Sequence, residues 1–411
     1  MTYGLIGEHL PHSYSKEIHN KLASYDYELV ELTHSELDGF MRARKFRAIN
    51  VTIPYKQDVI PYLETIDEHA RMIGAVNTIV NRGGKLYGYN TDFYGMSAMI
   101  AHLGLCLAGK KVAVLGTGGT SHTACEVARS MGAKSLLTVS RTARDGCITY
   151  ADLVRENTDT QILINTTPCG MYPNPEGKAV DVAAFPALEG VVDAVYNPLR
   201  PQLVMDAMAR GIPAEGGLYM LVAQAVRASE IFLDTEYPAD TTERVYRKIF
   251  LQKENIVLVG MPACGKSTVG RLIAEHTGRA FCDLDEEIVK AAGMSIPEIF
   301  QRDGEIGFRN LETQVLKAVA QQNSMVLATG GGAILRDENV VALRRNGRLY
   351  FIDRPLEELM PTEDRPLASS REAIRKRFEE RYPRYCAVAD SRVPVYGDAE
   401  AVARSIEQEM I

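Results

Sequence analysis

The stretch VLVGMPACGKSTVG, Val257–Gly270, decides the fold of the second part of this chain. An apolar strand runs into the pattern GxxxxGKS, and a helical pattern follows. Glycines in such a loop let backbone N–H groups point at phosphate oxygens, and the positive end of the following helix attracts the same charge. Lys266 is placed to reach the β and γ phosphates of a nucleotide, and Ser267 to ligate Mg²⁺. The stretch therefore predicts a phosphate-binding α/β unit that begins after more than half of the chain.

Length and composition limit what kind of protein this is. The 411 residues are enough for two or three domains of about 150 residues each. A net charge of -7 argues against a broad nucleic-acid surface, and seven scattered cysteines without a CxxC pair are typical of a reducing compartment. No signal-peptide pattern opens the chain, and no run approaches the ~20 apolar residues of a membrane helix. We expect a cytoplasmic protein with small-molecule substrates, no nucleic-acid or membrane partner, and an oligomeric state left open, a homo-oligomer included.

Strand and helix patterns alternate along the whole chain, which predicts the α/β fold class. Near-continuous apolar runs such as KKVAVLG, 110–116, are typical of parallel strands buried on both faces. The alternation restarts at IVLVG, 256–260, after the polar segment 234–255. We therefore expect a first unit over 1–248, a linker over 249–254 and a second unit over 255–411.

Charged residues and a glycine corner follow the phosphate-binding loop and are candidates for binding the phosphate acceptor. In chain order they are Asp283, Asp285, Arg309, Glu312, Gly330–Gly332, Arg365 and Arg381. Arg309 lies three residues before Glu312, so the two side chains can meet on one helical face. Taken singly, an Asp or an Arg of this kind is most often a solvated surface residue.

Together, the motifs DLD, GEIGFRNLE, GGG, RPL and RYPRY resemble shikimate kinase from residue 255 to the end of the chain. The resemblance implies that Asp285 holds the hydroxyl to be phosphorylated and acts as its base, and that Asp283 supports Mg²⁺ through water. It also implies that Arg365, in a lid, neutralises charge on the transferring phosphate. The residues implied to bind ATP are Ala263, Cys264, Gly265, Lys266, Ser267, Thr268 and Arg365.

The same resemblance implies a site for shikimate. Arg309 and Arg381 would bind its carboxylate, and Glu312 would orient Arg309. The implied shikimate-binding residues are Asp285, Arg309, Gly331, Gly332 and Arg381. The lid segment PLEELMPTED, 355–364, departs from the family because it is short and acidic and lacks the basic residues that the family often uses near the adenine.

A second glycine-rich turn lies in the first unit. VLGTGGTSHTA, 114–124, follows a predicted strand and opens a helix, as in dinucleotide-binding folds. The next strand ends without the acid that usually contacts NAD, and Arg141 there favours the 2′-phosphate of NADP, with Arg144 as a second candidate. The alternative is an exposed basic residue after a strand. The candidate NADP contacts are Gly116, Thr117, Gly118, Gly119, Thr120, Ser140, Arg141 and Thr142.

Short polar motifs fill the rest of the first unit: GEHLPHSYSKEIHN, NVTIPYK, GAVNTI, GYNTD, DAVYNP and GGLYMLVAQ. Each alone would most often be a turn, a cap or a surface polar segment. In this order they resemble shikimate dehydrogenase over essentially all of residues 1–248. The resemblance implies that Gly217 contacts the dinucleotide and that the substrate is bound by Ser13, Ser15, Thr52, Asn77, Tyr196 and Gln224.

Lys56 and Asp92 are the implied catalytic pair, and general chemistry supports the pairing. Reduction of a ketone by hydride creates an alkoxide, which needs a proton. A lysine ammonium close to a carboxylate can donate that proton and stabilise the charge as it builds. Two departures, Lys16 in place of a usual proline and Ser140 in place of a usual asparagine, remove no catalytic group.

The whole chain resembles a fusion of shikimate dehydrogenase and shikimate kinase. The expected architecture is a substrate α/β domain over 1–95 plus 220–248, a Rossmann-like NADP domain over 96–219, and a P-loop kinase α/β domain. The implied function is NADPH-dependent reduction of 3-dehydroshikimate to shikimate, followed by ATP-dependent phosphorylation to shikimate 3-phosphate, two consecutive steps of aromatic amino acid biosynthesis through chorismate.

Two alternatives stay open at this point. One is a quinate dehydrogenase joined to a different small-molecule kinase, against which Arg141 argues, because NAD is typical of quinate oxidation. The other is a sensor or repressor that kept the folds and lost catalysis. The presence of Lys56, Asp92, Lys266 and Asp285, and the absence of a basic helix-turn-helix or zinc pattern, argue against that alternative.

Overall fold

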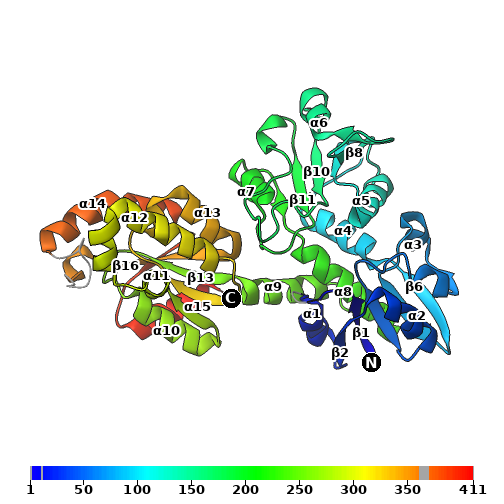
Figure 1. Cartoon of the computed structure of the whole chain (residues 1–411), viewed down its shortest axis with the longest axis horizontal. Coiled ribbons are helices and arrows are strands. Elements are labelled where there is room, and N and C mark those ends of the chain that lie inside the picture. The colour runs from blue at the N-terminus through cyan, green and yellow to red at the C-terminus, as the bar shows by residue number, and fades with distance from the viewer. Residues whose placement is uncertain (1, 11–12, 361–369, 411) are drawn as a thin grey trace. The chain divides into compact units, whose positions relative to one another are not determined.

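The computed structural model describes residues 2–10, 13–360 and 370–410. It divides into two compact units, Met1–Phe250 and Leu251–Ile411. Figure 1 shows that both units combine β-sheets with covering helices. The α/β class predicted from the sequence is therefore confirmed.

A mixed sheet opens the first unit. Its strands are β1 (Tyr3–Gly7), β2 (Tyr27–Glu31), β3 (Ala48–Val51), β4 (Thr65–Ile66), β5 (Thr78–Arg82) and β6 (Lys85–Tyr89). They lie in the order β2-β1-β3-β5-β6-β4, with β1 parallel to β2 and β3. Because β5 is antiparallel to β3, Asn50 pairs with Thr78, and the end of β3 meets the start of β5. This edge of the sheet carries several of the candidate substrate-binding residues.

The second sheet of this unit is parallel throughout. Its strands are β7 (Lys111–Leu115), β8 (Ser135–Ser140), β9 (Ile148–Thr149), β10 (Ile162–Asn165), β11 (Gly190–Asp193) and β12 (Ala214–Glu215). They lie in the order β12-β11-β10-β7-β8-β9. In open α/β sheets ligands bind beyond the carboxyl ends of the strands, where the strand order reverses. That point lies at the end of β7, beside β8 and β10.

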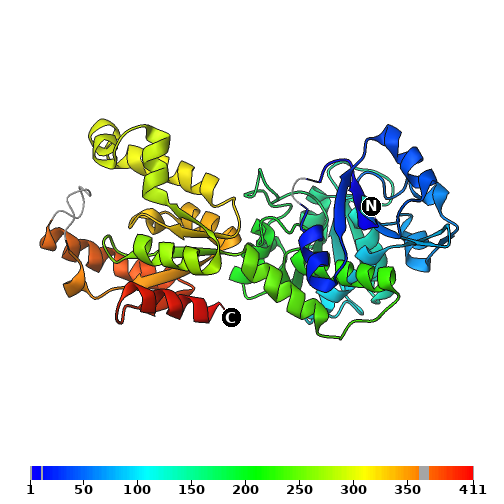
Figure 2. The same ribbon diagram turned by 90° about the horizontal axis from the view of Figure 1, so that it is seen from below.

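Helices surround and connect the two sheets. They are α1 (Ser15–Leu22), α2 (His34–Ala43), α3 (Glu68–Ile73), α4 (Thr91–His102), α5 (Gly119–Ser130), α6 (Tyr150–Glu156), α7 (Gln202–Ala209), α8 (Leu218–Leu233) and α9 (Thr241–Lys253), with the 3₁₀ turns η1 (Ile60–Tyr62) and η2 (Val182–Ala184). Helix α4 leads from the first sheet to the second, and α8 leads back (Figures 1 and 2).

Helices α4 and α8 cross closely, and a glycine makes this contact possible. A Cβ on Gly95 would lie 2.5 Å from the carbonyl oxygen of Met220 and 3.0 Å from the Cβ of Gln224. Met220 packs in the core of the parallel sheet, whereas Phe232 of the same helix packs against Tyr3 of the mixed sheet. Helix α8 therefore belongs to both cores and carries Gln224 to the substrate side.

The second unit contains a parallel sheet in the order β14-β15-β13-β16-β17. Its strands are β13 (Asn255–Val259), β14 (Ala280–Asp283), β15 (Met325–Ala328), β16 (Gly347–Asp353) and β17 (Ser391–Pro394). Its helices are α10 (Lys266–Thr277), α11 (Leu284–Ala292), α12 (Ile296–Val319), α13 (Asp337–Asn346), α14 (Arg371–Val388) and α15 (Ala399–Glu409), with the 3₁₀ turns η3 (Ala333–Leu335) and η4 (Leu356–Glu358). Figure 1 shows α10 and α15 on one face of the sheet and α12, α13 and α14 on the other. The central strand β13 feeds directly into the phosphate-binding loop.

Residues 249–254, expected to be a linker, form the end of helix α9 and the residue after it. Ile249 packs in the core of the first unit together with Val222 and Val226 of α8. The carbonyl groups of Leu251 and Glu254 accept hydrogen bonds from the guanidinium of Arg279 in the second unit. These bonds satisfy helix-end carbonyls that lack a partner within the helix.

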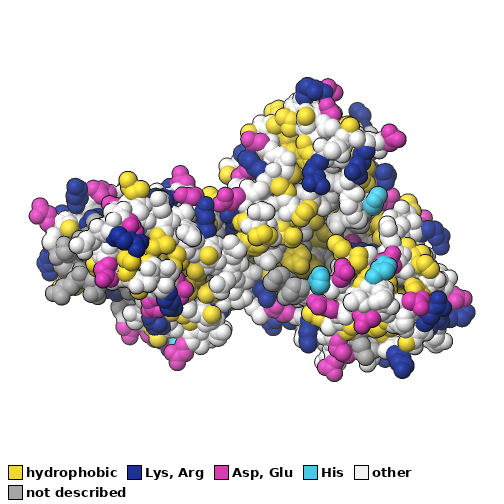
Figure 3. Space-filling view, viewed as in Figure 1, with side chains coloured by type: hydrophobic (Ala, Val, Ile, Leu, Met, Phe, Trp, Pro, Cys, Tyr) yellow, Lys and Arg dark blue, Asp and Glu magenta, His cyan; other side chains and the backbone are white. Residues whose placement is uncertain are grey.

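Charged side chains of both signs are mixed on the face of the molecule that Figure 3 shows. Lys and Arg side chains are interspersed with Asp and Glu in each unit (Figure 3). No helix among the described residues is both long and apolar enough to cross a membrane. The seven cysteines are all free.

Candidate active sites

A cavity of about 460 Å³ lies between the edge of the mixed sheet and helices α4 and α8. All of the substrate-binding and catalytic residues predicted for the dehydrogenase line it: Ser13, Ser15, Thr52, Lys56, Asn77, Asp92, Tyr196 and Gln224. Six further residues line it that were not predicted: Leu5, His9, Leu10, Asn50, Val51 and Leu221. Asn50 carried a sequence signal, because an asparagine interrupts an otherwise apolar strand.

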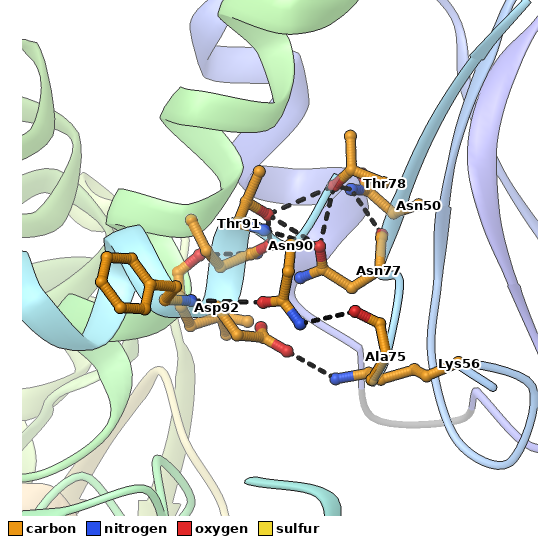
Figure 4. A network of polar contacts seen from close by, with 11 residues as sticks. Asn50, Lys56, Ala75, Asn77, Thr78, Asn90, Thr91 and Asp92 are labelled. Atoms are coloured by element: carbon orange, nitrogen blue, oxygen red, sulfur yellow. Dashed lines mark hydrogen bonds and ion pairs between the residues drawn. The ribbon is translucent and has the colours of Figure 1, made fainter. Parts of the chain in front are cut away.

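Lys56 and Asp92 form an ion pair inside this cavity. The Lys56 Nζ lies 2.6 Å from Asp92 Oδ2, and the two side chains are 23% and 16% exposed. Lys56 follows the end of β3, and Asp92 lies in the first turn of α4, so the pair joins two elements 36 residues apart (Figure 4). Partial burial strengthens such a pair relative to one on the surface. The contact with Asp92 therefore holds the Lys56 Nζ in the cavity.

Asn77 is the centre of a hydrogen-bond network beside this pair (Figure 4). Its Oδ1 accepts from the Thr91 backbone N–H at 2.8 Å, from the Thr91 hydroxyl at 3.2 Å and from the Thr78 hydroxyl at 3.0 Å. Asn50 donates to the Asn77 carbonyl and to Thr78. Leaving a buried donor unpaired costs about 1–3 kcal/mol, so the network fixes the orientation of the amide. Asn77 itself lines the cavity.

Asn90 and Gln224 hold the start of helix α4 from two sides. The Asn90 side chain accepts from the Phe93 N–H and donates to the Ala75 carbonyl at 2.9 Å, which caps the helix. Gln224 accepts from the Thr91 hydroxyl at 3.2 Å. These contacts set the direction of Asp92 toward Lys56.

Tyr196 reaches the cavity from the segment after β11. Asp193, at the end of that strand, accepts hydrogen bonds from Asn165 and from the Val195 N–H, both at 2.9 Å. Burial raises the pKa of Asp193 to about 7 and also raises the pKa of the Tyr196 phenol. The tyrosine is therefore a neutral hydrogen-bonding group at physiological pH.

A second cavity, of about 920 Å³, lies beyond the carboxyl ends of β7, β8 and β10. Six of the predicted dinucleotide residues line it: Gly116, Thr117, Gly118, Ser140, Arg141 and Thr142. Gly116 has φ 111°, and a Cβ there would lie 2.9 Å from Thr166 Oγ1. This loop therefore needs glycine both for its left-handed backbone and for its close approach to the end of β10.

A further group of residues that line this cavity was not predicted. They lie in the segment after β10 and at the start of α6: Tyr150, Thr166, Thr167, Pro168, Cys169, Gly170, Asn174, Gly177, Lys178 and Ala179. Arg144 lines the cavity as well and donates to the Thr117 hydroxyl at 3.3 Å. No motif or spacing in the sequence assigns the segment 166–179 to this site.

Three predicted dinucleotide residues lie elsewhere. Gly119 and Thr120 are the first residues of α5, and neither lines the described cavity. Gly217 precedes α8, where a Cβ would overlap the Ala194 carbonyl. Close packing against the end of β11 explains that glycine. Cofactor contact by these three residues stays a prediction.

The phosphate-binding loop of the second unit has the backbone that its sequence predicts. Gly260 and Gly265 have φ 151° and 102°, and Ala263 has φ 63°. The Lys266 Nζ is buried and donates to the carbonyls of Gly260 at 3.0 Å and Met261 at 2.9 Å. The lysine thus lies folded along the inside of its own loop, where incoming phosphate oxygens would replace the carbonyls.

Ser267 and Asp283 lie together beside this loop. The serine hydroxyl donates to Asp283 Oδ2 at 2.6 Å. The other carboxylate oxygen of Asp283 caps α11 by accepting from the Asp285 N–H at 3.0 Å. A hydroxyl next to a carboxylate supplies the hard oxygen ligands that Mg²⁺ prefers, usually together with several waters.

A buried charged cluster faces the glycine corner after β15. Arg309 donates to Glu312 Oε2 at 2.7 Å, and both side chains are nearly inaccessible to solvent. Burial raises the pKa of the Glu312 carboxyl, whereas the charge and hydrogen bond of Arg309 oppose this shift. A Cβ on Gly330 would lie 2.7 Å from Asp285 Oδ1, and one on Gly332 would overlap the Arg309 guanidinium. Glycine is therefore required for these charges to approach the loop.

Arg381 completes the cluster from helix α14. Its guanidinium donates to the Gly331 carbonyl at 3.1 Å, and the Tyr385 hydroxyl donates to the Gly260 carbonyl at 2.9 Å. Burial lowers the pKa of Arg381, and the like charge of Arg309 acts in the same direction. Two guanidinium groups held close together favour an anionic ligand that relieves their repulsion. Arg365, predicted to contact ATP, lies outside the described residues.

Each of the two units matches a known protein family. Residues 5–79 match the family model of the shikimate dehydrogenase substrate binding domain. A shikimate dehydrogenase (NADP(+)) from Clostridium perfringens is 36% identical over 264 residues, which cover 60% of this chain and 97% of that protein. The chain belongs to the shikimate dehydrogenase family. Residues 262–411 match the family model of shikimate kinase, so the chain joins an oxidoreductase unit to a kinase unit.

Solved shikimate dehydrogenases agree with the fold of the first unit. Shikimate dehydrogenase 1 from Peptoclostridium difficile has a TM-score of 0.55 and 32% identity, and the match covers 61% of this chain and 98% of that one. The shikimate 5-dehydrogenase from Thermus thermophilus, solved with NADP(H) and shikimate, has a TM-score of 0.55 and 25% identity over 60% of this chain and 99% of that one. The predicted fusion of the two families in one chain is confirmed.

Proposed function

We propose that this chain catalyses two consecutive reactions, reduction of 3-dehydroshikimate to shikimate with NADPH and phosphorylation of the shikimate 3-hydroxyl with ATP. The observation that carries the proposal is that one chain joins a shikimate dehydrogenase unit to a shikimate kinase unit. The first unit has a proton-donating ion pair in a cavity rich in neutral hydrogen-bonding groups. The second has an anion-binding pair of arginines and a carboxylate next to a phosphate-binding loop. The free cysteines support action in a reducing compartment such as the cytoplasm.

In the first unit, Lys56 carries out the proton transfer. NADPH, when bound, supplies the hydride. The Lys56 Nζ donates a proton to the ketone oxygen as negative charge develops there, and Asp92 at 2.6 Å keeps the lysine charged and directed into the cavity. Asn77, Tyr196 and Gln224 orient the ring hydroxyls, and Ser13 and Ser15 bind the carboxylate.

The dinucleotide cavity fits NADPH. Its glycine loop lies at the start of helix α5, where backbone N–H groups attract a pyrophosphate. Arg141 and Arg144 line the cavity at the end of β8 and its following turn, where the 2′-phosphate of the adenosine ribose would lie. Arg144 is engaged in a hydrogen bond to the Thr117 hydroxyl. Arg141 is therefore the main candidate for discriminating NADPH from NADH.

Arg141→Ala should weaken NADPH much more than NADH. A hydrogen bond to a charged group is worth about 1.5–3 kcal/mol, which corresponds to a loss of about 10- to 100-fold in affinity. NADPH fluorescence titration and kcat/KM for both cofactors would measure this. Arg129→Ala is a matched control, because Arg129 is an exposed arginine of α5 in the same unit that pairs with Glu126. Equal losses for NADPH and NADH would contradict the assignment.

In the second unit, Asp285 holds and deprotonates the acceptor hydroxyl, while Arg309 and Arg381 fix the shikimate carboxylate. Mg²⁺, when bound at Ser267 and through water at Asp283, neutralises phosphate charge. Lys266 exchanges its loop carbonyls for β- and γ-phosphate oxygens. Positioning and charge neutralisation of this kind account for most of the catalysis in phosphoryl transfer.

A coupled assay tests the two reactions together. With 3-dehydroshikimate, ATP and Mg²⁺ present, ADP should form only after NADPH is added, because the kinase needs the product of the reductase. Phosphorus NMR should place the new phosphate on the 3-hydroxyl. Quinate and 3-dehydroquinate serve as competing substrates. ADP release that does not depend on NADPH, or a preference for the quinate series, would contradict the proposal.

A further inference from the structure

Arg354 lies against the phosphate-binding loop, in a place that the predicted kinase site does not include. It is the residue after strand β16, beside the central strand β13. Its Nε donates to the Cys264 carbonyl at 3.2 Å. Its Nη2 lies 3.7 Å from the position that a Cβ on Gly265 would take. Gly265 precedes the first turn of α10, so this guanidinium lies at the end of the helix toward which nucleotide phosphates are drawn.

The carboxylates around Arg354 leave its charge available. Glu358 Oε2 lies 2.9 Å from Arg354 Nη1, and the two side chains are 51% and 26% exposed. The neighbouring Asp353 is engaged by Arg392 at 2.5 Å and by the Tyr382 hydroxyl at 3.2 Å. A partly exposed pair four residues apart contributes little to stability. Arg354 can therefore exchange Glu358 for a phosphate oxygen without a large cost.

The sequence between Arg354 and Arg365 supplies no other cation. Residues 355–364 contain no Lys or Arg and four acidic side chains, Glu357, Glu358, Glu363 and Asp364. A nucleotide brings several negative charges to the phosphate-binding loop, which Arg354 contacts. Arginine is suited to the task, because its planar fork binds phosphate through two parallel hydrogen bonds. Among the described residues, Arg354 places its guanidinium against the backbone of the phosphate-binding loop, at the Cys264 carbonyl.

We propose that Arg354 is a nucleotide-binding residue of the kinase unit, whose guanidinium binds the phosphate chain of ATP and ADP, and that Glu358 holds it beside the loop when the nucleotide is absent. This inference rests on the proposed kinase function. The residue supplies positive charge from the end of β16, and residues 355–364 contribute none. The loop carbonyl of Cys264 fixes its position, so the cation is placed before the nucleotide arrives.

The test uses the full chain and ADP as the probe, measured by isothermal titration calorimetry. Arg354→Met should raise the Kd for ADP and the KM for ATP by about tenfold or more, because a charge-assisted hydrogen bond is lost. The KM for shikimate and the dehydrogenase activity should not change. Arg354→Lys should recover part of the affinity. Arg404→Met is the matched control, because Arg404 also pairs with a glutamate four residues away at 2.9 Å, on helix α15.

Glu358→Gln should change the affinity for ADP in the opposite direction. Removing the competing carboxylate should tighten ADP by about twofold. Equal ADP affinity in the Arg354→Met and Arg404→Met variants would overturn the inference. Loss of ADP affinity accompanied by a lower unfolding temperature, without recovery by lysine, would also overturn it, because Arg354 would then only support the loop. Absence of shikimate phosphorylation by the unmutated chain would instead contradict the proposed function, since ADP binding does not depend on the acceptor.

Discussion

Lys56→Ala is expected to lower the turnover of 3-dehydroshikimate by about 10²-fold or more while kinase activity persists. General acid catalysis by one positioned side chain contributes about 10²–10⁴-fold, and the Lys56 Nζ, held at 2.6 Å from Asp92, is the proposed proton donor. Ser13, Asn77, Tyr196 and Gln224 remain in the cavity, so the effect should fall on kcat more than on KM. Initial rates of NADPH oxidation at several concentrations of 3-dehydroshikimate measure both constants.

Two controls separate this effect from a general disturbance. Lys110→Ala removes another lysine of the same unit that is paired with a carboxylate, Glu189 at 2.8 Å, and lies outside the cavity. It should leave turnover unchanged. Asp92→Asn keeps a hydrogen-bond acceptor beside Lys56 but removes the charge, so turnover should fall less than in the lysine variant. Near-normal turnover of Lys56→Ala would show that another group donates the proton.

Lys266→Ala is expected to remove shikimate phosphorylation, by at least about 10²–10³-fold, and to leave the dehydrogenase unchanged. A preorganised positive group aimed at developing charge is worth this much in rate, and Lys266 is the ammonium buried within the loop. The measurement is ADP formation at saturating shikimate, with NADPH oxidation recorded on the same preparation. Loss of both activities would contradict the independence of the two sites.

The alanine variant also removes a support of the loop, because Lys266 bonds to the carbonyls of Gly260 and Met261. Lys266→Met keeps most of the side-chain volume and should show the same loss of activity. Lys290→Ala is the control within the unit, since Lys290 forms an exposed pair with Glu287 at 2.7 Å. A methionine variant with substantial kinase activity would show that the charge is not what matters.

The loop residues of both glycine turns could be predicted because their requirements are local. Gly116, Gly260 and Gly265 have left-handed backbone angles that glycine adopts without steric cost. Gly116 and Gly260 each follow a buried strand directly, and Gly265 directly precedes helix α10. A strand, such a turn and a helix lie consecutively in the sequence, so neighbouring residues specify them. Lys266 and Ser267 could be predicted for the same reason, because they are the first two residues of the helix that follows the loop.

Residues that meet across long sequence separations were predictable only through the family resemblance. Nothing local to Arg309 indicates that Arg381 will approach it, or that Gly331 will lie between them. Their meeting depends on helix α12, the end of β15 and helix α14 packing on one sheet. The segment 166–179 and Arg354 had neither a local pattern nor a motif from the resemblance, and they were missed.

The sequence by itself therefore determined which chemical groups each unit has and which backbone turns are candidates for binding phosphate, because glycine angles and strand–helix alternation act over a few residues. The tertiary structure decided how those groups are directed. Asn77 has its carbonyl oxygen fixed by Thr78 and Thr91, and Lys56 meets Asp92 only because β3 and the start of α4 converge. Arg354 reaches the loop because β16 pairs with β13. Side-chain direction is set by packing between elements, and packing depends on contacts that no short stretch of sequence contains.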